Sequence, residues 1–446
     1  MRLDYLQVKN FKGFEEHNFH FHPNFNLIVG RNGTGKTSAL DAIAVAIGSW
    51  FLGVRGEDTR HIRPSEILLK NTGADRGNNP TESRFEQQFP CEVYAEGDVL
   101  GEHMKWKRAL NSPSGRTTYG EAATIKKMGV KADNAVRAGE DIQLPLICYY
   151  GTGRLWLESK EAFLVQGYEK LSKKRDLSRL AGYRYSIDPK LSVAQFTNWM
   201  ARQDWLTYQN KKPSDHYETV KTAIISCVEN AIDIEFDPKI GEVVVTFQDF
   251  SRPFSLLSDG QRCILAVIGD LAQKAVTLNP QLGVQVLNET SGIVMIDELD
   301  LHLHPLWQRH VIEDLRRVFP KIQFICTTHS PFLIQALRSA QELVMLDGEP
   351  LSNVDHLSIE TIAQSLQGVE NTETSLRYER DKAFAKTQLE TMQEAAILNT
   401  EEKRRVANKL RTQLERYSDD PAFQAFLEMQ RVADLGEWAK GLLCAQ

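Results

Sequence analysis

A glycine-rich stretch at residues 30–37 constrains the fold of this 446-residue chain more than any other feature. It reads GRNGTGKT and matches the pattern G-x-x-x-x-G-K-[ST] of a phosphate-binding P-loop. The apolar run at residues 25–29 predicts a buried strand before the loop, and residues 38–47 have aliphatic residues at helical spacing after it. Strand, loop and helix in this order place backbone N–H groups and a positive helix end around a phosphate. The stretch therefore predicts an α/β fold with a phosphate site.

The side chains of this loop have separate predicted tasks. Lys36 would reach the β- and γ-phosphates of a nucleotide, and the hydroxyl of Thr37 would hold a Mg²⁺ ion. The residues that we expect to bind nucleotide here are Asn32, Gly33, Thr34, Gly35, Lys36, Thr37 and Ser38.

The segment before the loop alternates apolar and polar residues, as half-buried strands do. Residues 3–8 and 17–22 predict an antiparallel hairpin over the nucleotide-binding strand, with residues 9–14 (KNFKGF) leading into its turn. Lys12 has two interpretations, a contact beside the adenine or α-phosphate and a solvated turn lysine. Lys12 is therefore a candidate nucleotide-binding residue.

Two carboxylates follow another apolar run. Residues 293–296 predict a fully buried strand, and Asp297 and Glu298 come directly after it. Asp297 suits a Mg²⁺ contact, and Glu298 is placed to polarise a water molecule. His302 and His304 lie nearby, but the sequence offers them no third ligand for a metal site.

Three further stretches bring polar groups to the predicted site. A strand at residues 322–326 delivers His329 to the same edge of the sheet. A strand at residues 144–150 runs into GTGR at residues 151–154. The carboxyl edge of such a sheet is where phosphate ligands bind, although a tight turn with a surface arginine is the alternative for GTGR. Ser258, shortly before an apolar helix at residues 263–274, predicts a second helix N-terminus that binds an anion.

Composition and net charge exclude some classes of protein. With 25% charged residues, 42% hydrophobic residues and a net charge of −6, the chain is not a uniformly basic nucleic-acid binder. The basic run at residues 104–108 fits either a nucleic-acid backbone contact or the charged face of an edge strand. The six cysteines form no C-x-x-C pair, and neither a signal peptide nor a membrane-spanning run is found. These features predict a reduced, soluble, cytoplasmic protein.

The order of the motifs resembles the head of ABC-type ATPases: P-loop, Ser-x-Gly-Gln, Asp-Glu after a strand, and His after a strand. The KNFKGF opening is similar to the SMC and RecF branch. The run YYGTGR at residues 149–154 and the compact length resemble the PtuA ATPases of Septu and retron anti-phage defence systems. The resemblance covers residues 1–346 and implies an α/β ABC-type P-loop ATPase head. This head has a mixed sheet with an antiparallel β subdomain, a helical insertion and a helical C-terminal region.

The resemblance also implies ATP and Mg²⁺ as cofactors and roles for the matching residues. Residues 30–37 correspond to Walker A, and Asp297 and Glu298 to Walker B. Glu298 and His329 become the catalytic residues, Thr37 and Asp297 the metal-binding residues, and Asp300 the D-loop. The signature, which would contact ATP held by the opposite protomer, consists of Ser258, Gly260 and Gln261.

Two departures from the family pattern stand out. Residues 151–153 occupy the place of the Q-loop without a glutamine, which puts the usual Mg²⁺ and water contact in doubt. A short helical segment at residues 156–231 stands where the break-repair members carry a coiled coil and a zinc hook. Long-range tethering of DNA ends is therefore not expected.

The implied function is a dimeric ATPase, closed on two nucleotides, that regulates a nuclease or nucleic-acid effector in bacterial defence. Its expected partners are a second copy of the chain and an HNH-type nuclease, with DNA or RNA as a further candidate. The alternative is a RecF-like DNA-repair ATPase without a nuclease partner. A nuclease on the chain itself, as in the OLD family, lacks an Asp-x-Asp after a strand, and the opening motif disfavours a transporter subunit.

We expect four segments along the chain. Residues 1–155 form an ATPase lobe with Walker A and the antiparallel subdomain, and this lobe is loop-rich between residues 53 and 131. Residues 156–233 form the helical insertion, with a basic cluster between residues 170 and 184 and helical patterns at residues 192–208 and 216–231. A hairpin of strands at residues 232–236 and 242–247 is expected next. Residues 234–350 form a second lobe with the signature, Walker B and His329, and residues 351–446 form a helical C-terminal region. Apolar residues three or four apart after residue 419 predict a stripe that is buried against either the head or a partner protein.

Overall fold

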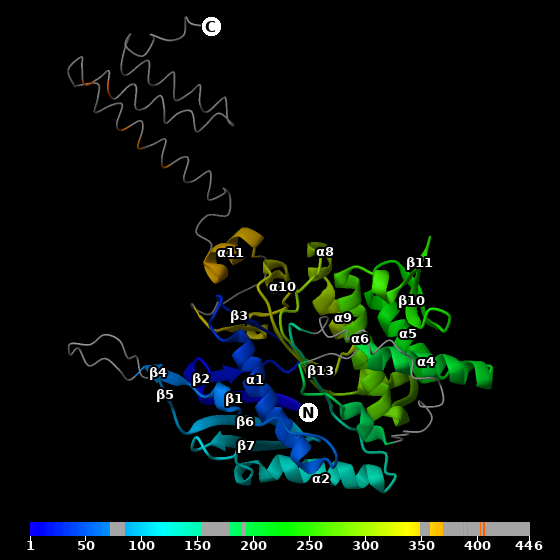
Figure 1. Ribbon diagram of the computed structural model, residues 1–446, viewed down its shortest axis with the longest axis horizontal. Coiled ribbons are helices and arrows are strands. Elements are labelled where there is room, and N and C mark those ends of the chain that lie inside the picture. Colours follow the sequence, from blue (N-terminus) through cyan, green and yellow to red (C-terminus); the bar gives the residue numbers. More distant parts are fainter. Residues whose placement is uncertain are drawn as a thin grey trace, which may run out of the picture. The chain divides into compact units, whose positions relative to one another are not determined.

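The computed structural model describes residues 1–71, 85–153, 178–189, 193–347 and 357–368, with a few isolated positions beyond residue 380. The chain divides into two compact units, Met1–Gly368 and Val369–Gln446. All of the strands named below belong to the first unit (Figure 1). The four-segment division stays a prediction, and the apolar stripe after residue 419 lies outside the described residues.

A five-stranded parallel sheet forms the centre of the first unit. Its strand order is β14 (Leu343–Met345), β3 (Phe25–Val29), β13 (Ile322–Thr327), β12 (Gly292–Ile296) and β8 (Leu146–Tyr150). The four strands other than β14 are buried along their whole length, as expected for a parallel sheet covered by helices on both faces. Because the strands are parallel, the segments that follow them meet at one edge of the sheet.

Helix α1 (Lys36–Ile47) is packed between this parallel sheet and a four-stranded antiparallel sheet (Figure 1). The indole Nε1 of Trp106 donates to the carbonyl oxygen of Ala46 at 2.9 Å and ties the antiparallel sheet to the helix. The strand order of this sheet is β2 (Phe14–His20), β1 (Arg2–Phe11), β6 (Cys91–Val99) and β7 (Glu102–Leu110). The predicted α/β head with an antiparallel β subdomain is confirmed.

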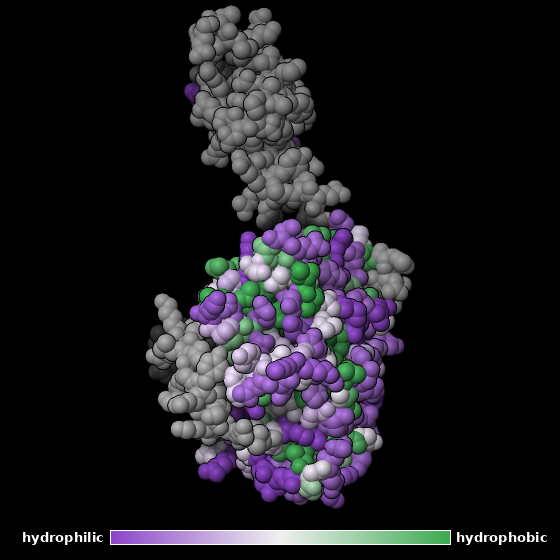
Figure 2. Space-filling model, turned by 90° about the vertical axis from the view of Figure 1, so that its right-hand side faces the viewer, coloured by the Kyte–Doolittle hydropathy of each residue, from purple (hydrophilic) through white to green (hydrophobic). Residues whose placement is uncertain are grey.

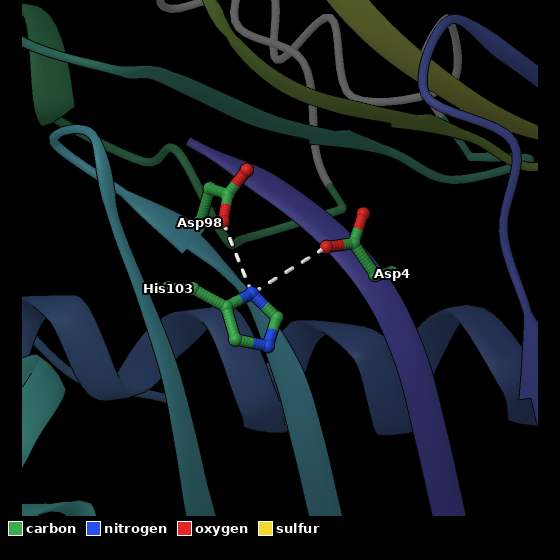
Figure 3. Close-up of side chains that lie close together, drawn as sticks. All are labelled: Asp4, Asp98 and His103. Carbon is green, nitrogen blue, oxygen red and sulfur yellow. Dashed lines mark hydrogen bonds and ion pairs between the residues drawn. The ribbon is translucent and has the colours of Figure 1, made fainter.

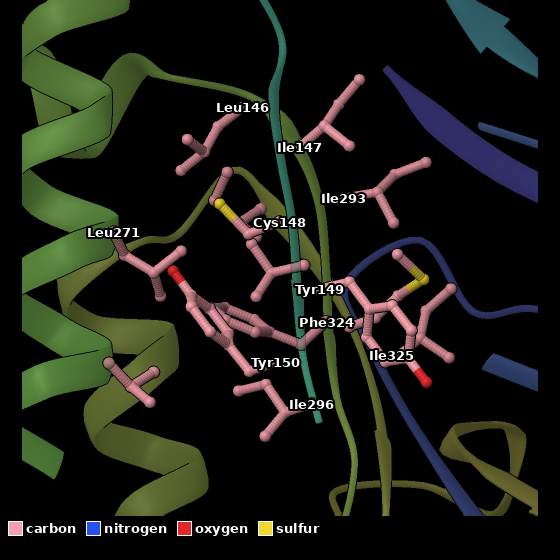
Figure 4. Close-up of a cluster of buried hydrophobic side chains, with 14 of the residues drawn as sticks. Leu146, Ile147, Cys148, Tyr149, Tyr150, Leu271, Ile293, Ile296, Phe324 and Ile325 are labelled. Carbon is pink, nitrogen blue, oxygen red and sulfur yellow. The ribbon is translucent and has the colours of Figure 1, made fainter. Parts of the chain in front are cut away.

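Helix α6 (Asp259–Leu278) contacts β8, and apolar side chains of both elements share one buried cluster (Figure 4). A polar group lies within this core: the Tyr150 hydroxyl donates to Asp270 Oδ2 at 2.7 Å, and Lys274 Nζ lies 3.0 Å from the same oxygen. Burial raises the pKa of Tyr150, so the phenol stays protonated and keeps its donor role. These contacts fix the helix that begins beside Ser258 to the central sheet.

The predicted helix at residues 216–231 is shorter in the structure. It is α5 (Asp215–Cys227), and Asn230 then has a φ of 60°, which turns the chain into β9 (Ala231–Asp237). The predicted hairpin of β9 and β10 (Glu242–Phe247) is confirmed, and β11 (Ser251–Pro253) completes a three-stranded sheet. Helix α4 (Val193–Asn210) agrees with the predicted helix at residues 192–208.

Helix α2 (Ala123–Arg137) lies where the sequence predicts only a loop-rich stretch. The sequence did not predict this helix because Gly129 lies in its middle, where a glycine lowers helical propensity. A Cβ added there would lie 2.4 Å from the carbonyl oxygen of Trp50, so close packing against the 3₁₀ segment Gly48–Gly53 requires glycine. The remaining elements are β4 (Leu69–Asn71), β5 (Phe85–Gln87), α7 (Val286–Glu289), α8 (Pro305–Gln308), α9 (Val311–Val318), α10 (Pro331–Gln335) and α11 (Ile359–Gln367).

Five of the six cysteines lie in the described part of the chain. All five are buried, and none of them forms a disulfide bond. None of the described helices combines the length and the apolar character that are needed to cross a lipid bilayer.

Candidate nucleotide site

The glycine-rich loop leaves β3 and enters α1 with two residues in the left-handed region. Gly33 has a φ of 85° and Gly35 a φ of 105°, conformations that glycine adopts without strain. A Cβ on Gly35 would lie 2.7 Å from the ring of Phe14, so the β1–β2 hairpin lies directly against the loop. The Thr34 hydroxyl donates to the carbonyl oxygen of Arg31 at 2.9 Å and closes the turn.

Lys36 extends along the inside of this loop. Its Nζ donates to the carbonyl oxygens of Gly30 at 2.8 Å and Arg31 at 3.1 Å, and the residue is only 8% exposed. Burial lowers the pKa of Lys36, while nearby carboxylates, Asp347 foremost, oppose that shift. The structure thus holds a buried ammonium group at the loop, where a phosphate chain would lie.

Thr37 and Asp297 come together although 260 positions separate them in sequence. The Thr37 hydroxyl donates to Asp297 Oδ2 at 2.9 Å, and the Thr327 hydroxyl donates to Asp297 Oδ1 at 2.6 Å. The Thr37 hydroxyl and the Asp297 carboxylate lie beside each other and offer oxygen ligands, which are the ligands that Mg²⁺ prefers. The loop helix and the ends of β12 and β13 therefore converge on one carboxylate.

Glu298 follows Asp297 in a strained backbone conformation. Its φ is 47°, and its N–H donates to the Thr327 hydroxyl at 2.7 Å. A residue other than glycine in the left-handed region is uncommon, and such strain concentrates at functional sites. Beyond it, the Thr328 hydroxyl donates to Asp300 Oδ1 at 2.5 Å, so both threonines at the end of β13 hold the segment that carries Glu298.

His329 is the next residue after these threonines, and it is exposed. Its carbonyl oxygen accepts a hydrogen bond of 2.7 Å from Gln367 Nε2 at the end of α11. This hydrogen bond joins the backbone of His329 to α11. Its predicted catalytic role stays a prediction.

The predicted signature forms the start of α6. Ser258 is the N-cap: its Oγ accepts from the N–H of Gln261 at 3.3 Å, and the Gln261 side chain accepts from the N–H of Ser258 at 3.1 Å. A Cβ on Gly260 would lie 2.7 Å from the carbonyl oxygen of His302, so the signature packs against the D-loop segment. None of the hydrogen bonds described for Ser258 and Gln261 reaches residues 30–38.

Lys12 lies beside α1. Its Nζ forms an ion pair with Asp41 of that helix, and Asp41 also receives Arg60 Nη2 at 3.4 Å and the Tyr149 hydroxyl at 3.5 Å. The structure thus gives Lys12 a partner on α1. Its contact with nucleotide stays a prediction.

Both lysines of the basic run on β7 are paired with carboxylates of the neighbouring strand β6. Lys105 pairs with Glu96 at 3.0 Å, and Lys107 pairs with Glu92 at 3.2 Å. Arg108 is fully buried and donates to neutral acceptors such as the carbonyl oxygen of Thr118. These contacts match the edge-strand interpretation of the run. Arg154 of the GTGR turn lies outside the described residues, and so do residues 170–175 of the basic cluster.

A separate polar cluster lies on the antiparallel sheet (Figure 3). His103 Nδ1 lies 3.1 Å from Asp98 Oδ1 and 3.8 Å from Asp4 Oδ2. Arg2 forms ion pairs of 2.7 Å with both carboxylates. Because the guanidinium group of Arg2 already forms ion pairs with both carboxylates, we assign no metal ion to this cluster.

Sequence reasoning named Lys36, Thr37, Asp297 and Glu298, and the structure brings them together. It missed Thr327 and Thr328, whose hydroxyl groups hold the two acidic segments, and Asp347, which contacts the loop at Arg31. The threonines precede His329 directly, so a strand that ends in hydroxyl residues was the available signal.

Two family models match the chain. The first, described as an AAA domain, matches residues 5–264. The second, an AAA domain of the AbiEii toxin and type IV TA system group, matches residues 199–335.

Named relatives and a solved structure also match. The chain is 24% identical to the "Retron Ec83 probable ATPase" of Escherichia coli over 78% of this chain and 72% of that protein. It is 26% identical to the "Septu protein PtuA" of Bacillus mycoides over 78% of this chain but only 41% of that protein. The SMC head domain from Thermotoga maritima matches with a TM-score of 0.41 and 16% identity, over 77% of this chain and 94% of that one. Since the AAA-domain family model matches residues 5–264, more than half of this chain, the chain belongs to the AAA-domain family and is an ATPase.

Proposed function

We propose that this chain is a dimeric, Mg²⁺-dependent ABC-type ATPase that regulates a nuclease or nucleic-acid effector in bacterial anti-phage defence. The observation that carries the proposal is the junction of Thr37, Asp297 and Thr327 beside Lys36. It joins the loop to two other strand ends in the arrangement that phosphoryl transfer needs. We place the protein in the cytoplasm, in keeping with the five described cysteines, which are buried and form no disulfide bond.

In this proposal, the residues of one head position the phosphates and the attacking water. Backbone N–H groups of residues 33–37 and the ammonium group of Lys36 bind the phosphate chain. Thr37 and Asp297 hold a Mg²⁺ ion, which neutralises phosphate charge when it is bound. Glu298 orients a water molecule and takes its proton, and His329 lies at the same sheet edge to contact the γ-phosphate.

The proposed dimer follows from the placement of the signature. The hydrogen bonds described for Ser258 and Gln261 join these two residues to each other and not to residues 30–38, so in this proposal a second copy supplies them to the site. Large apolar side chains flank this surface: Leu256 is 68% exposed and Leu306 is 60% exposed. Figure 2 views the side on which β10 and β11 lie in Figure 1, and hydrophobic residues interrupt the hydrophilic surface there. Exposed apolar side chains beside a half-site support association of two heads.

The proposed partner is an HNH-type nuclease, because the relatives include proteins named for retron and Septu systems. In the PtuA family that the chain resembles, the ATPase works with such a nuclease. The alternative is a RecF-like repair ATPase that binds DNA without a dedicated nuclease.

The test is to co-express the chain with an HNH nuclease encoded beside it and to measure DNA cleavage by the purified complex with and without ATP. We expect a stable complex whose cleavage rate changes with ATP, and whose response is altered in Glu298→Gln but not in Glu289→Gln. Glu289 is a matched control because it forms a surface ion pair with Lys321. A chain that binds DNA, recruits no nuclease and hydrolyses ATP would support the alternative instead.

A further inference from the structure

A carboxylate that none of the sequence motifs contains lies against the glycine-rich loop. Strand β14 pairs with β3 up to Met345 opposite Val29, and the N–H of Leu346 donates to the carbonyl oxygen of Val29 at 3.0 Å. Asp347 is the next residue, so the edge strand of the sheet delivers its side chain to the first residues of the loop.

Asp347 contacts Arg31 through both the backbone and the side chain. Arg31 Nε lies 2.8 Å from Asp347 Oδ2, and the N–H of Arg31 lies 3.3 Å from each carboxylate oxygen. A Cβ on Gly30 would lie 2.9 Å from Asp347 Oδ1, so the carboxylate lies directly against the loop backbone. Arg31 lowers the pKa of Asp347, which keeps the carboxylate charged at neutral pH.

This charge acts on the phosphate site. Asp347 lies against Gly30 and Arg31, and the carbonyl oxygens of these two residues accept from Lys36 Nζ at 2.8 Å and 3.1 Å. A carboxylate beside this part of the loop repels the anion that Lys36 would bind. Arg31 is 73% exposed and Asp347 only 19%, so the arginine is free to turn while the acid is fixed.

We propose that Asp347 competes with the phosphates of the nucleotide for Arg31 and thereby sets the affinity of the loop for ATP. When ATP binds, the guanidinium group of Arg31 turns from Asp347 to the phosphate chain. Arg31 is then a further nucleotide-binding residue, and Asp347 is a positioning residue that acts through it. The inference rests on the proposed nucleotide site.

The test measures the dissociation constants of ATP, ADP and AMP for the full-length chain at low and high salt. Asp347→Asn keeps the shape of the side chain and removes its charge, so ATP should bind about two- to fivefold more tightly, in line with exposed charge pairs. Arg31→Ala should weaken ATP binding by a similar factor. Both effects should be smaller for AMP and should shrink at high salt.

Asp314→Asn is the matched control, because Asp314 pairs with Arg317 in helix α9, outside the loop, and its loss should leave the affinities unchanged. A purely structural role for Asp347 would give weaker binding and a lower melting temperature, whereas competition gives tighter binding. If Lys36→Ala abolishes ATP binding but Asp347→Asn does not tighten it, or Arg31→Ala does not weaken it, this inference is wrong and the nucleotide site stands. If Lys36→Ala binds ATP normally, the proposed site itself is wrong.

Discussion

Replacing Glu298 with glutamine should remove most ATP hydrolysis while leaving ATP binding in place. The side chain follows the Asp297 carboxylate at the end of β12, and the hydrogen bond from its own N–H to Thr327 holds its backbone at a φ of 47°. Glutamine keeps the shape and the contact but is not a base. Loss of a general base costs about 10²–10⁴-fold in rate, so turnover should fall by that factor.

The measurement is steady-state phosphate release, with a parallel binding titration on the same protein. Glu289→Gln removes the same charge from a surface residue and should leave the rate unchanged. Turnover near the wild-type rate in Glu298→Gln would show that another group activates the water.

Replacing Lys36 with alanine should instead abolish tight ATP binding. The ammonium group is buried and bonded to two carbonyl oxygens of the loop, so it is held at the place where we propose that the phosphates bind. Removing one partner of a buried, hydrogen-bonded charge pair costs about 2–5 kcal/mol, which corresponds to a loss of affinity of about 30- to 5000-fold.

Equilibrium titration with ATP checks this prediction, and the melting temperature without nucleotide shows whether the fold is intact. Lys321→Ala removes an exposed lysine from the surface and should bind ATP as the wild type does. A Lys36→Ala protein that is folded and binds ATP with unchanged affinity would remove the P-loop assignment.

The strands that carry the site could be predicted because their signal is local. Continuous apolar runs such as residues 25–29 and 293–296 indicate buried parallel strands, and the residues after such strands gather at one edge. Lys36, Thr37, Asp297 and Glu298 could therefore be named from their positions after a strand.

The rest of the site depends on which strands are neighbours. Thr327 reaches Asp297 because β13 pairs with β12, and Asp347 reaches Arg31 because β14 pairs with β3. Strand order is a long-range property that no window of the sequence contains. The roles of these two residues therefore could not be predicted.

Contacts between distant parts of the chain also explain the basic run on β7 and the presence of helix α2. The paired lysines of β7 match the edge-strand interpretation, because the facing carboxylates lie on a neighbouring strand and on a later loop segment. Helix α2 was missed because its Gly129 is a weak helix former in isolation, yet it is the residue that close contact with Trp50 requires.

Mixing two inactive variants shows whether ATP is hydrolysed in a site that two copies of the chain share. Lys36→Ala lacks the loop lysine, and Ser258→Arg places a long cation at the exposed N-cap of α6. Each variant alone should be inactive. In an equimolar mixture, half of the dimers contain one copy of each, and one of their two sites is intact, so about a quarter of the wild-type rate should return. An inactive mixture, or full activity of Ser258→Arg alone, would contradict the shared site.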